Sequence, residues 1–205
     1  MNAYQAEQLE ALRMVRQLLG ALSEAEAGTL KADIADYRRF RSQVAGFLDA
    51  HFKDICTEKC FSSRLSACCS KNGIITFFAD VVVNALVSDD EDLDRIEWAI
   101  QNPANAFKCI FLSEGGCLWR IKPVVCEFFL CDEAENRAFG DNPEAKKQFE
   151  VFKEIKKHFT WPDKPVLFER LEEFFLSRGC RSSLMYIHFS PGLSRIRQNR
   201  NSALS

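Results

Sequence analysis

Apolar residues recur at helical spacing along most of the chain, beginning at the N-terminus. Within residues 3–27, polar residues separate apolar positions that lie three or four apart: Leu12, Val15, Leu19 and Leu22. This spacing predicts an amphipathic α-helix. A second periodic stretch follows Gly28 and extends to Leu48. Together they predict an N-terminal helical hairpin over residues 1–52, or one long helix bent near Gly28. Two packing helices or a dimerising coiled coil would account for the pattern.

The most apolar stretch of the chain covers residues 74–87 and is interrupted by Asp80 and Asn84. It is shorter than the roughly 20 apolar residues of a membrane span, so it predicts a buried helix instead. Ser88 follows, with three acidic residues after it, and this order predicts a capped start for the next helix. Pro103 is expected to end that helix.

The second half of the chain predicts an irregular region followed by two helices. Residues 104–142 contain glycine and proline breakers and lack a helical period. Asn142 and Pro143 then form a helix start, and a last helix is expected from about Lys164 to the terminator Gly179. No stretch shows several strands with period-two alternation. The predicted fold class is therefore mainly α, a helical domain with an irregular Cys-rich metal-binding loop region and the N-terminal hairpin.

The composition is that of an ordinary globular protein, with 47% hydrophobic and 27% charged residues among 205. Lys and Arg total 27 and Asp and Glu total 29, which gives a formal net charge of -2. This balance argues against nucleic acid or a membrane as partner. The first residues lack the basic and apolar regions of a secretory signal, so we expect a cytoplasmic protein.

The segment 181–205 is interpreted as a basic C-terminal tail. The last acidic residue of the chain is Glu173, and four arginines follow Gly179: Arg181, Arg195, Arg197 and Arg200. A solvated, partly disordered terminus is the favoured interpretation, and contact with phosphate or an acidic partner is the alternative.

Cysteine is the most informative residue type, because eight of the nine cysteines lie within residues 56–131. They occur beside Gly, Pro and basic residues in segments without helical period, which predicts metal coordination rather than the packing of small apolar side chains. Structural thiols and a redox dithiol are the alternatives. The candidate metal ligands, within a predicted domain over residues 53–180, are Cys56, Cys60, Cys68, Cys69, Cys109, Cys117, Cys126 and Cys131.

Thiolate is a soft ligand that selects zinc, copper(I) or an iron–sulfur cluster. A zinc ion or a cubane cluster takes four protein ligands, so eight cysteines exceed one site. Adjacent side chains diverge, so Cys68 and Cys69 are not expected to bind one small ion together. One principal site is favoured and a second is left open, with the strongest ligand candidates being Cys69, Cys109, Cys117 and Cys126.

The run from Cys109 to Cys131, C-I-F-L-S-E-G-G-C-L-W-R-I-K-P-V-V-C-E-F-F-L-C, resembles the second half of a known family. The family comprises cysteine-cluster proteins of the CxxCxxCC type described as zinc- or iron-chelating domains. Its pattern reads C-P-F-L, a glycine turn, C-x-I-Y, R-P and C-R. The resemblance covers about residues 52–132 and includes the vicinal pair Cys68-Cys69. This chain differs from the pattern by wider spacing of the preceding cysteines and at Ile110, Lys122 and Glu127.

The resemblance implies a protein that holds an iron–sulfur cluster or zinc through clustered cysteines. Because the family includes flagellin lysine N-methylases, it also implies, as one alternative, a methyltransferase-like enzyme using S-adenosylmethionine. A second alternative is a zinc-stapled interaction module that binds a protein partner through its N-terminal helices. Basic residues beside the cysteines suit either metal, whereas the aromatic residues there would limit solvent access and favour an iron–sulfur cluster.

Overall fold

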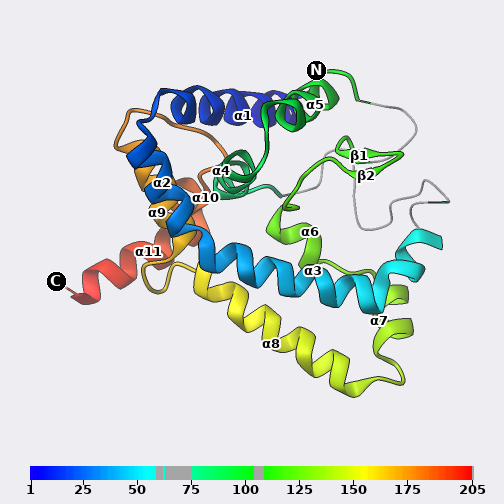
Figure 1. The fold of residues 1–205 in the computed structure, drawn as a ribbon. Helices are drawn as coiled ribbons and strands as arrows, with labels where there is room; N and C mark the ends of the chain where they lie inside the picture. Colours follow the sequence, from blue (N-terminus) through cyan, green and yellow to red (C-terminus); the bar gives the residue numbers. More distant parts are fainter. Residues whose placement is uncertain (59–61, 63–74, 104–108, 205) are drawn as a thin grey trace.

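The computed structural model describes residues 1–58, 62, 75–103 and 109–204, and these residues form a mainly α-helical fold (Figure 1). The prediction of a mainly α fold is therefore confirmed. Cys60, Cys68 and Cys69 lie outside the described residues. The elements, in chain order, are α1 (Ala3–Ala21), α2 (Glu24–Asp33), α3 (Ala35–Cys56), α4 (Phe78–Val87), α5 (Asp90–Gln101), β1 (Leu112–Ser113), β2 (Gly116–Cys117), α6 (Val124–Phe128), α7 (Asp132–Phe139), α8 (Pro143–Thr160), α9 (Leu167–Leu176), α10 (Tyr186–Phe189) and α11 (Pro191–Leu204).

The N-terminal helices break earlier than predicted. Ser23 caps α2 by accepting a hydrogen bond from the backbone N–H of Glu26, whose side chain in turn accepts from the N–H of Ser23. This reciprocal capping box fixes a helix start at that point. Gly28 lies inside α2, so the predicted break at Gly28 is wrong, and Ile34 alone separates α2 from α3.

The helices α1 and α3 pack against different neighbours. α1 contacts α4 and α5, whereas α3 contacts α6, α7 and α8. α3 and α8 run side by side in opposite directions (Figure 1). Their interface contains phenylalanine rings: the centroid of Phe47 lies 5.9 Å from that of Phe149 and 5.5 Å from that of Phe152. The abundant phenylalanine of the chain thus serves as core material, as such large apolar rings do.

The two central helices follow the sequence prediction closely. α4 is buried along nearly its whole length, and α5 ends at Gln101, just before Pro103. The cap of α5 differs by one residue. Asp89 rather than Ser88 accepts the hydrogen bond from Asp92 N–H, and the buried Ser88 hydroxyl has no hydrogen-bond partner among the described residues.

Part of the region predicted to be irregular is helical. α6 and α7 fall within residues 104–142, together with the two-residue strands β1 and β2. A helix of five or eight residues contains too few turns to show a period, which explains why the sequence pattern missed both. The flanking predictions are confirmed, because Asn142 caps α8 and Gly179, with φ of 80°, follows α9.

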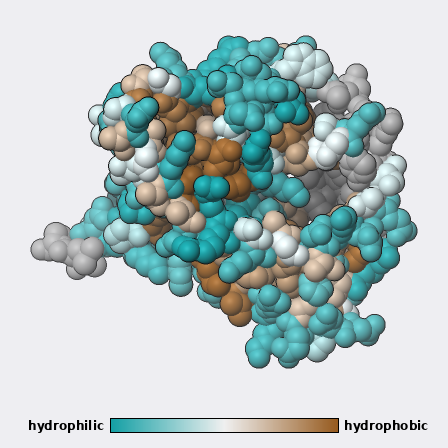
Figure 2. All heavy atoms as spheres, viewed as in Figure 1, coloured by the Kyte–Doolittle hydropathy of each residue, from teal (hydrophilic) through white to brown (hydrophobic). Residues whose placement is uncertain are grey.

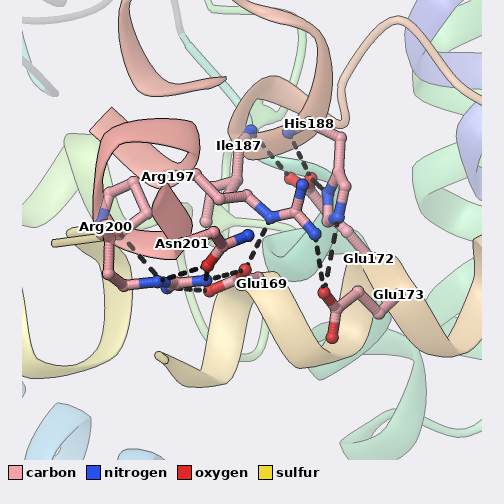
Figure 3. A network of polar contacts seen from close by, with 9 residues as sticks. Glu169, Glu172, Glu173, Ile187, His188, Arg197, Arg200 and Asn201 are labelled. Carbon is pink, nitrogen blue, oxygen red and sulfur yellow. Dashed lines mark hydrogen bonds and ion pairs between the residues drawn. The ribbon is translucent and has the colours of Figure 1, made fainter. Parts of the chain in front are cut away.

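The C-terminal segment is helical and docked, so the prediction of partial disorder is wrong, whereas a solvated surface is confirmed, because no side chain of residues 191–202 is fully buried. Glu169 of α9 accepts hydrogen bonds from Arg197 at 2.6 Å and, through both oxygens, from Arg200 at 2.7 Å (Figure 3). Glu172, on the same face of α9, accepts from the backbone N–H groups of Ile187 and His188. Ion pairs therefore attach α11 to α9, and hydrogen bonds from backbone N–H groups attach α10 to the same helix.

The surface is mixed in polarity. Figure 2 shows polar residues over much of one face, with apolar side chains in smaller areas between them. Among the described helices, none combines the length and the apolar character that a membrane crossing requires.

Candidate functional site

A cavity of about 670 Å³ lies between the end of α3, the β1–β2 hairpin and α6. Its wall includes four of the predicted ligands: Cys56, Cys109, Cys117 and Cys126. Cys56 is distant in sequence from the other three, and the fold brings all four to one cavity. The volume falls within the range of about 300 to 1,000 Å³ that is typical of small-ligand sites.

Each of the four cysteines is carried by a different local structure. Cys56 is the last residue of α3, and Cys109 is buried just before β1. Cys117 belongs to β2, and Cys126 lies in the middle of α6. Cys131 precedes the first residue of α7 and is not among the residues that line the cavity.

The described thiols do not form a complete metal site by themselves. Within the described ranges, no group of three or more His, Cys, Asp or Glu side chains is arranged to hold a metal ion. None of the six described cysteines is joined by a disulfide to another of the six. The donor chemistry and the shared cavity fit a soft metal or a cluster, whereas closure of a coordination sphere would require further ligands.

The β1–β2 hairpin determines where Cys117 lies. Leu112 pairs with Cys117 and Ser113 pairs with Gly116 across the two strands. Gly116 has a φ of 105°, a conformation that favours glycine, and the Ser113 hydroxyl donates to the Gly116 carbonyl at 2.9 Å. The backbone N–H of Leu112 also donates to the Cys109 carbonyl, so the turn holds both cysteines.

Residues 120–124, which we call the connecting segment, join Cys117 to the start of α6. Two polar side chains of α4 hold this segment. Asn84 Oδ1 accepts hydrogen bonds from the backbone N–H of Arg120 at 3.0 Å and of Ile121 at 3.3 Å. One helical turn earlier, Asp80 Oδ1 accepts from the N–H of Val124 at 2.9 Å. Both side chains are almost completely buried.

Arg41 of α3 holds the same segment from another side. Its guanidinium donates to the Lys122 carbonyl at 2.6 Å and to Glu127 at 2.9 Å. It also donates to the hydroxyl of Tyr37. Glu127 is the neighbour of Cys126 in α6, so this ion pair ties the cysteine-bearing helix to α3. The acidic side chain of Glu127 thus provides the partner for Arg41.

The carboxyl group of Asp80 has an unusual protonation equilibrium. Burial raises the pKa of Asp80 from 3.8 to about 7. The positive charge of Arg41 and the N–H groups of Val124 and Phe77 oppose this rise because they favour the ionised form. A buried group that changes charge near neutral pH thus lies directly behind the connecting segment.

The sequence analysis did not identify Arg41, Asp80, Asn84 or Glu127 as functional residues. A signal existed for the two residues of α4, because polar side chains inside an otherwise apolar helix must find hydrogen-bond partners. Their spacing of four positions also places them on one face of the helix. No comparable signal marked the pair of Arg41 and Glu127, which depends on the packing of α3 against α6.

Aromatic residues complete the surroundings of the cavity. Trp119 is 5% exposed, lines the cavity and packs edge-on against Phe111, with ring centroids 5.2 Å apart. Burial, together with the nearby sulfur atoms of Cys109 and Cys126, raises the pKa of Tyr4, which places the start of α1 close to the site. No model of a known protein family matches the chain, and none of the curated proteins or solved structures matches it.

Proposed function

We propose that this chain is a metal-binding protein whose clustered cysteines hold an iron–sulfur cluster or a zinc ion. The observation that carries the proposal is that Cys56, Cys109, Cys117 and Cys126 line one cavity. Scattered structural thiols would not be expected to meet in this way. Thiolates bind zinc and iron–sulfur clusters in preference to magnesium or calcium, which take oxygen ligands.

The ligand set is proposed to combine cavity cysteines with cysteines of the segment that follows α3. The described residues alone contain no three-donor group. We therefore propose at least one of Cys60, Cys68 and Cys69 as a further ligand, and Cys69 is the strongest of these candidates from the sequence. Cys131 lies outside the cavity, so we assign it to no principal ligand position. Thiols that bind metal must stay reduced, which is consistent with a cytoplasmic location.

An iron–sulfur cluster is favoured over zinc by the size and lining of the cavity. A single tetrahedral ion is enclosed by its four ligands, whereas the cavity measures about 670 Å³. Its wall includes the buried rings of Phe111 and Trp119, and apolar surroundings of this kind tune a redox cluster. The same volume supports the alternative of an enzyme, such as a methyltransferase, with a small-molecule site beside the metal.

Elemental analysis of the full chain, purified without oxygen, tests the proposal. A brown protein that contains iron and acid-labile sulfide, with broad visible absorption, would support an iron–sulfur cluster. A colourless protein with stoichiometric zinc would support the zinc site and the stapled interaction module. The absence of stoichiometric metal from freshly purified protein, and after anaerobic reconstitution with iron and sulfide or with zinc, would overturn the proposed function.

A further inference from the structure

We propose that Asn84, Asp80 and Arg41 are positioning residues that hold the connecting segment in one conformation whether or not metal is bound. This inference rests on the proposed function and deepens it, because it states how one half of the site is held in place before metal binds. The cysteines at the two ends of this half are Cys117 and Cys126.

The first support is that the hydrogen bonds involve the backbone of the connecting segment rather than its side chains. The N–H groups of Arg120 and Ile121 both donate to Asn84, and the N–H of Val124 donates to Asp80. The Lys122 carbonyl accepts from Arg41. Proline at position 123 has no N–H and a fixed φ. Apart from Lys122, each residue of the segment thus either lacks a backbone N–H or donates it to a side chain of α4.

The second support is the burial of the three side chains. Asn84 is 1% exposed, Arg41 is 2% exposed and Asp80 is 3% exposed. A buried polar side chain that lost its partners would destabilise the fold, so these side chains stabilise the observed path of the segment. None of the contacts involves a sulfur atom, so none is made through a candidate metal ligand.

The third support is the way the ends of the segment are fixed. On the outside of the segment, the Arg120 side chain forms ion pairs with Asp89 and Asp92 at the start of α5. At the other end, Glu127 pairs with Arg41. The segment is therefore held between α3, α4 and α5, which all belong to the helical core. Metal binding then has to fix mainly the positions of the cysteines that lie outside the stretch from Cys117 to Cys126.

Asn84→Ala is the direct test, because it removes the acceptor for two backbone N–H groups. Residues that orient metal ligands typically affect metal affinity by about 10- to 100-fold. We expect a loss of zinc affinity of about that size, measured by competition with a chelator, and an altered cobalt(II)–thiolate absorption spectrum. Glu172→Gln is the matched control, since Glu172 is equally buried but bonds α10. It should lower thermal stability without changing zinc affinity. Unchanged affinity in folded Asn84→Ala protein would overturn the inference.

Hydrogen exchange of the wild-type chain provides a test that does not depend on the folding of a variant. In metal-free protein, the amides of Arg120, Ile121 and Val124 should be protected to the same degree as after zinc is added. Amides that exchange freely until metal is added would overturn the inference while leaving the proposed function intact. If the wild type binds neither zinc nor a cluster, the proposed function itself fails.

Discussion

The ion pair between Arg41 and Glu127 is removed almost completely from solvent. Arg41 Nη2 lies 2.9 Å from Glu127 Oε2, and the two side chains are 2% and 6% exposed. One residue lies on α3 and the other lies beside a candidate metal ligand on α6. Because this buried pair joins α3 to the helix that carries a candidate ligand, its loss is expected to disturb both the fold and the candidate site.

Arg41→Met should destabilise the protein strongly, because it leaves the Glu127 carboxylate buried without its partner. Removing one member of a buried pair costs about 3–5 kcal/mol. The double variant Arg41→Met/Glu127→Leu should recover much of this loss, since no uncompensated charge remains. Urea denaturation followed by circular dichroism measures both. Arg39→Met, which breaks an exposed pair with Asp36, serves as control and should change stability by about 0–1 kcal/mol. Equal effects of Arg39→Met and Arg41→Met would contradict the prediction.

The raised pKa of Asp80 predicts a specific pH dependence of stability. The folded-state pKa of about 7 exceeds the ordinary value of 3.8, so between these values the folded protein holds a proton that the unfolded chain releases. The stabilisation that comes from the protonated Asp80 carboxyl group is therefore fully present below pH 3.8. It is lost as the pH rises toward 7. The free energy of unfolding of the wild type should fall over this window relative to that of Asp80→Asn. The exposed variant Asp141→Asn should follow the wild type. A pH-independent difference between wild type and Asp80→Asn would refute the assignment.

Glu169→Gln should loosen the C-terminal helix. Glu169 is 2% exposed and accepts from both Arg197 and Arg200 (Figure 3). Hydrogen bonds to charged groups each contribute about 1.5–3 kcal/mol, and no side chain of α11 between residues 191 and 200 is fully buried. We expect faster hydrogen exchange of α11, and earlier proteolytic cleavage within it, while α3 and α8 stay protected. Raised ionic strength should act in the same direction on the wild type. Exchange of α11 identical to that of the wild type would rule out this role for Glu169.

Cys117→Ser and Cys126→Ser should each abolish metal retention, whereas Cys180→Ser should retain it. The first two cysteines line the cavity, and Cys180 follows α9 outside it. Serine preserves size but replaces a soft donor with a hard one. Metal per chain after desalting is the measurement. Cys131→Ser extends the test, because retention in this variant would agree with its place outside the cavity. The same metal content in the Cys117, Cys126 and Cys180 variants would disprove the ligand assignment.

The sequence predicted those parts of the fold that carry long periodic patterns. α4, α5 and α8 were expected within a few residues of their observed bounds because each has many apolar positions and a clear terminator. α6 was missed because five residues show no period. α11 was missed because its helix is attached by charges to α9, and ion pairs between distant segments leave no local pattern.

The candidate site was likewise predicted only in part. The sequence placed Cys109, Cys117 and Cys126 in one candidate site, and all three line one cavity, while their role as metal ligands stays a prediction. Cys56 was a candidate, and the fold adds that it shares their cavity. The supporting residues required the three-dimensional arrangement, since Arg41 lies far in sequence from the backbone carbonyl that it holds. Only Asp80 and Asn84 were visible in advance, as interruptions of an apolar run.

The buried position of Trp119 makes its fluorescence a probe of the cavity. Of the three tryptophans, Trp98 and Trp161 are 62% and 41% exposed, whereas Trp119 is 5% exposed and borders the cavity. Its emission should appear at shorter wavelength than that of the other two indoles, since it is shielded from water. A coloured centre formed nearby would quench this blue component first, so fluorescence alone can follow loading and loss in real time.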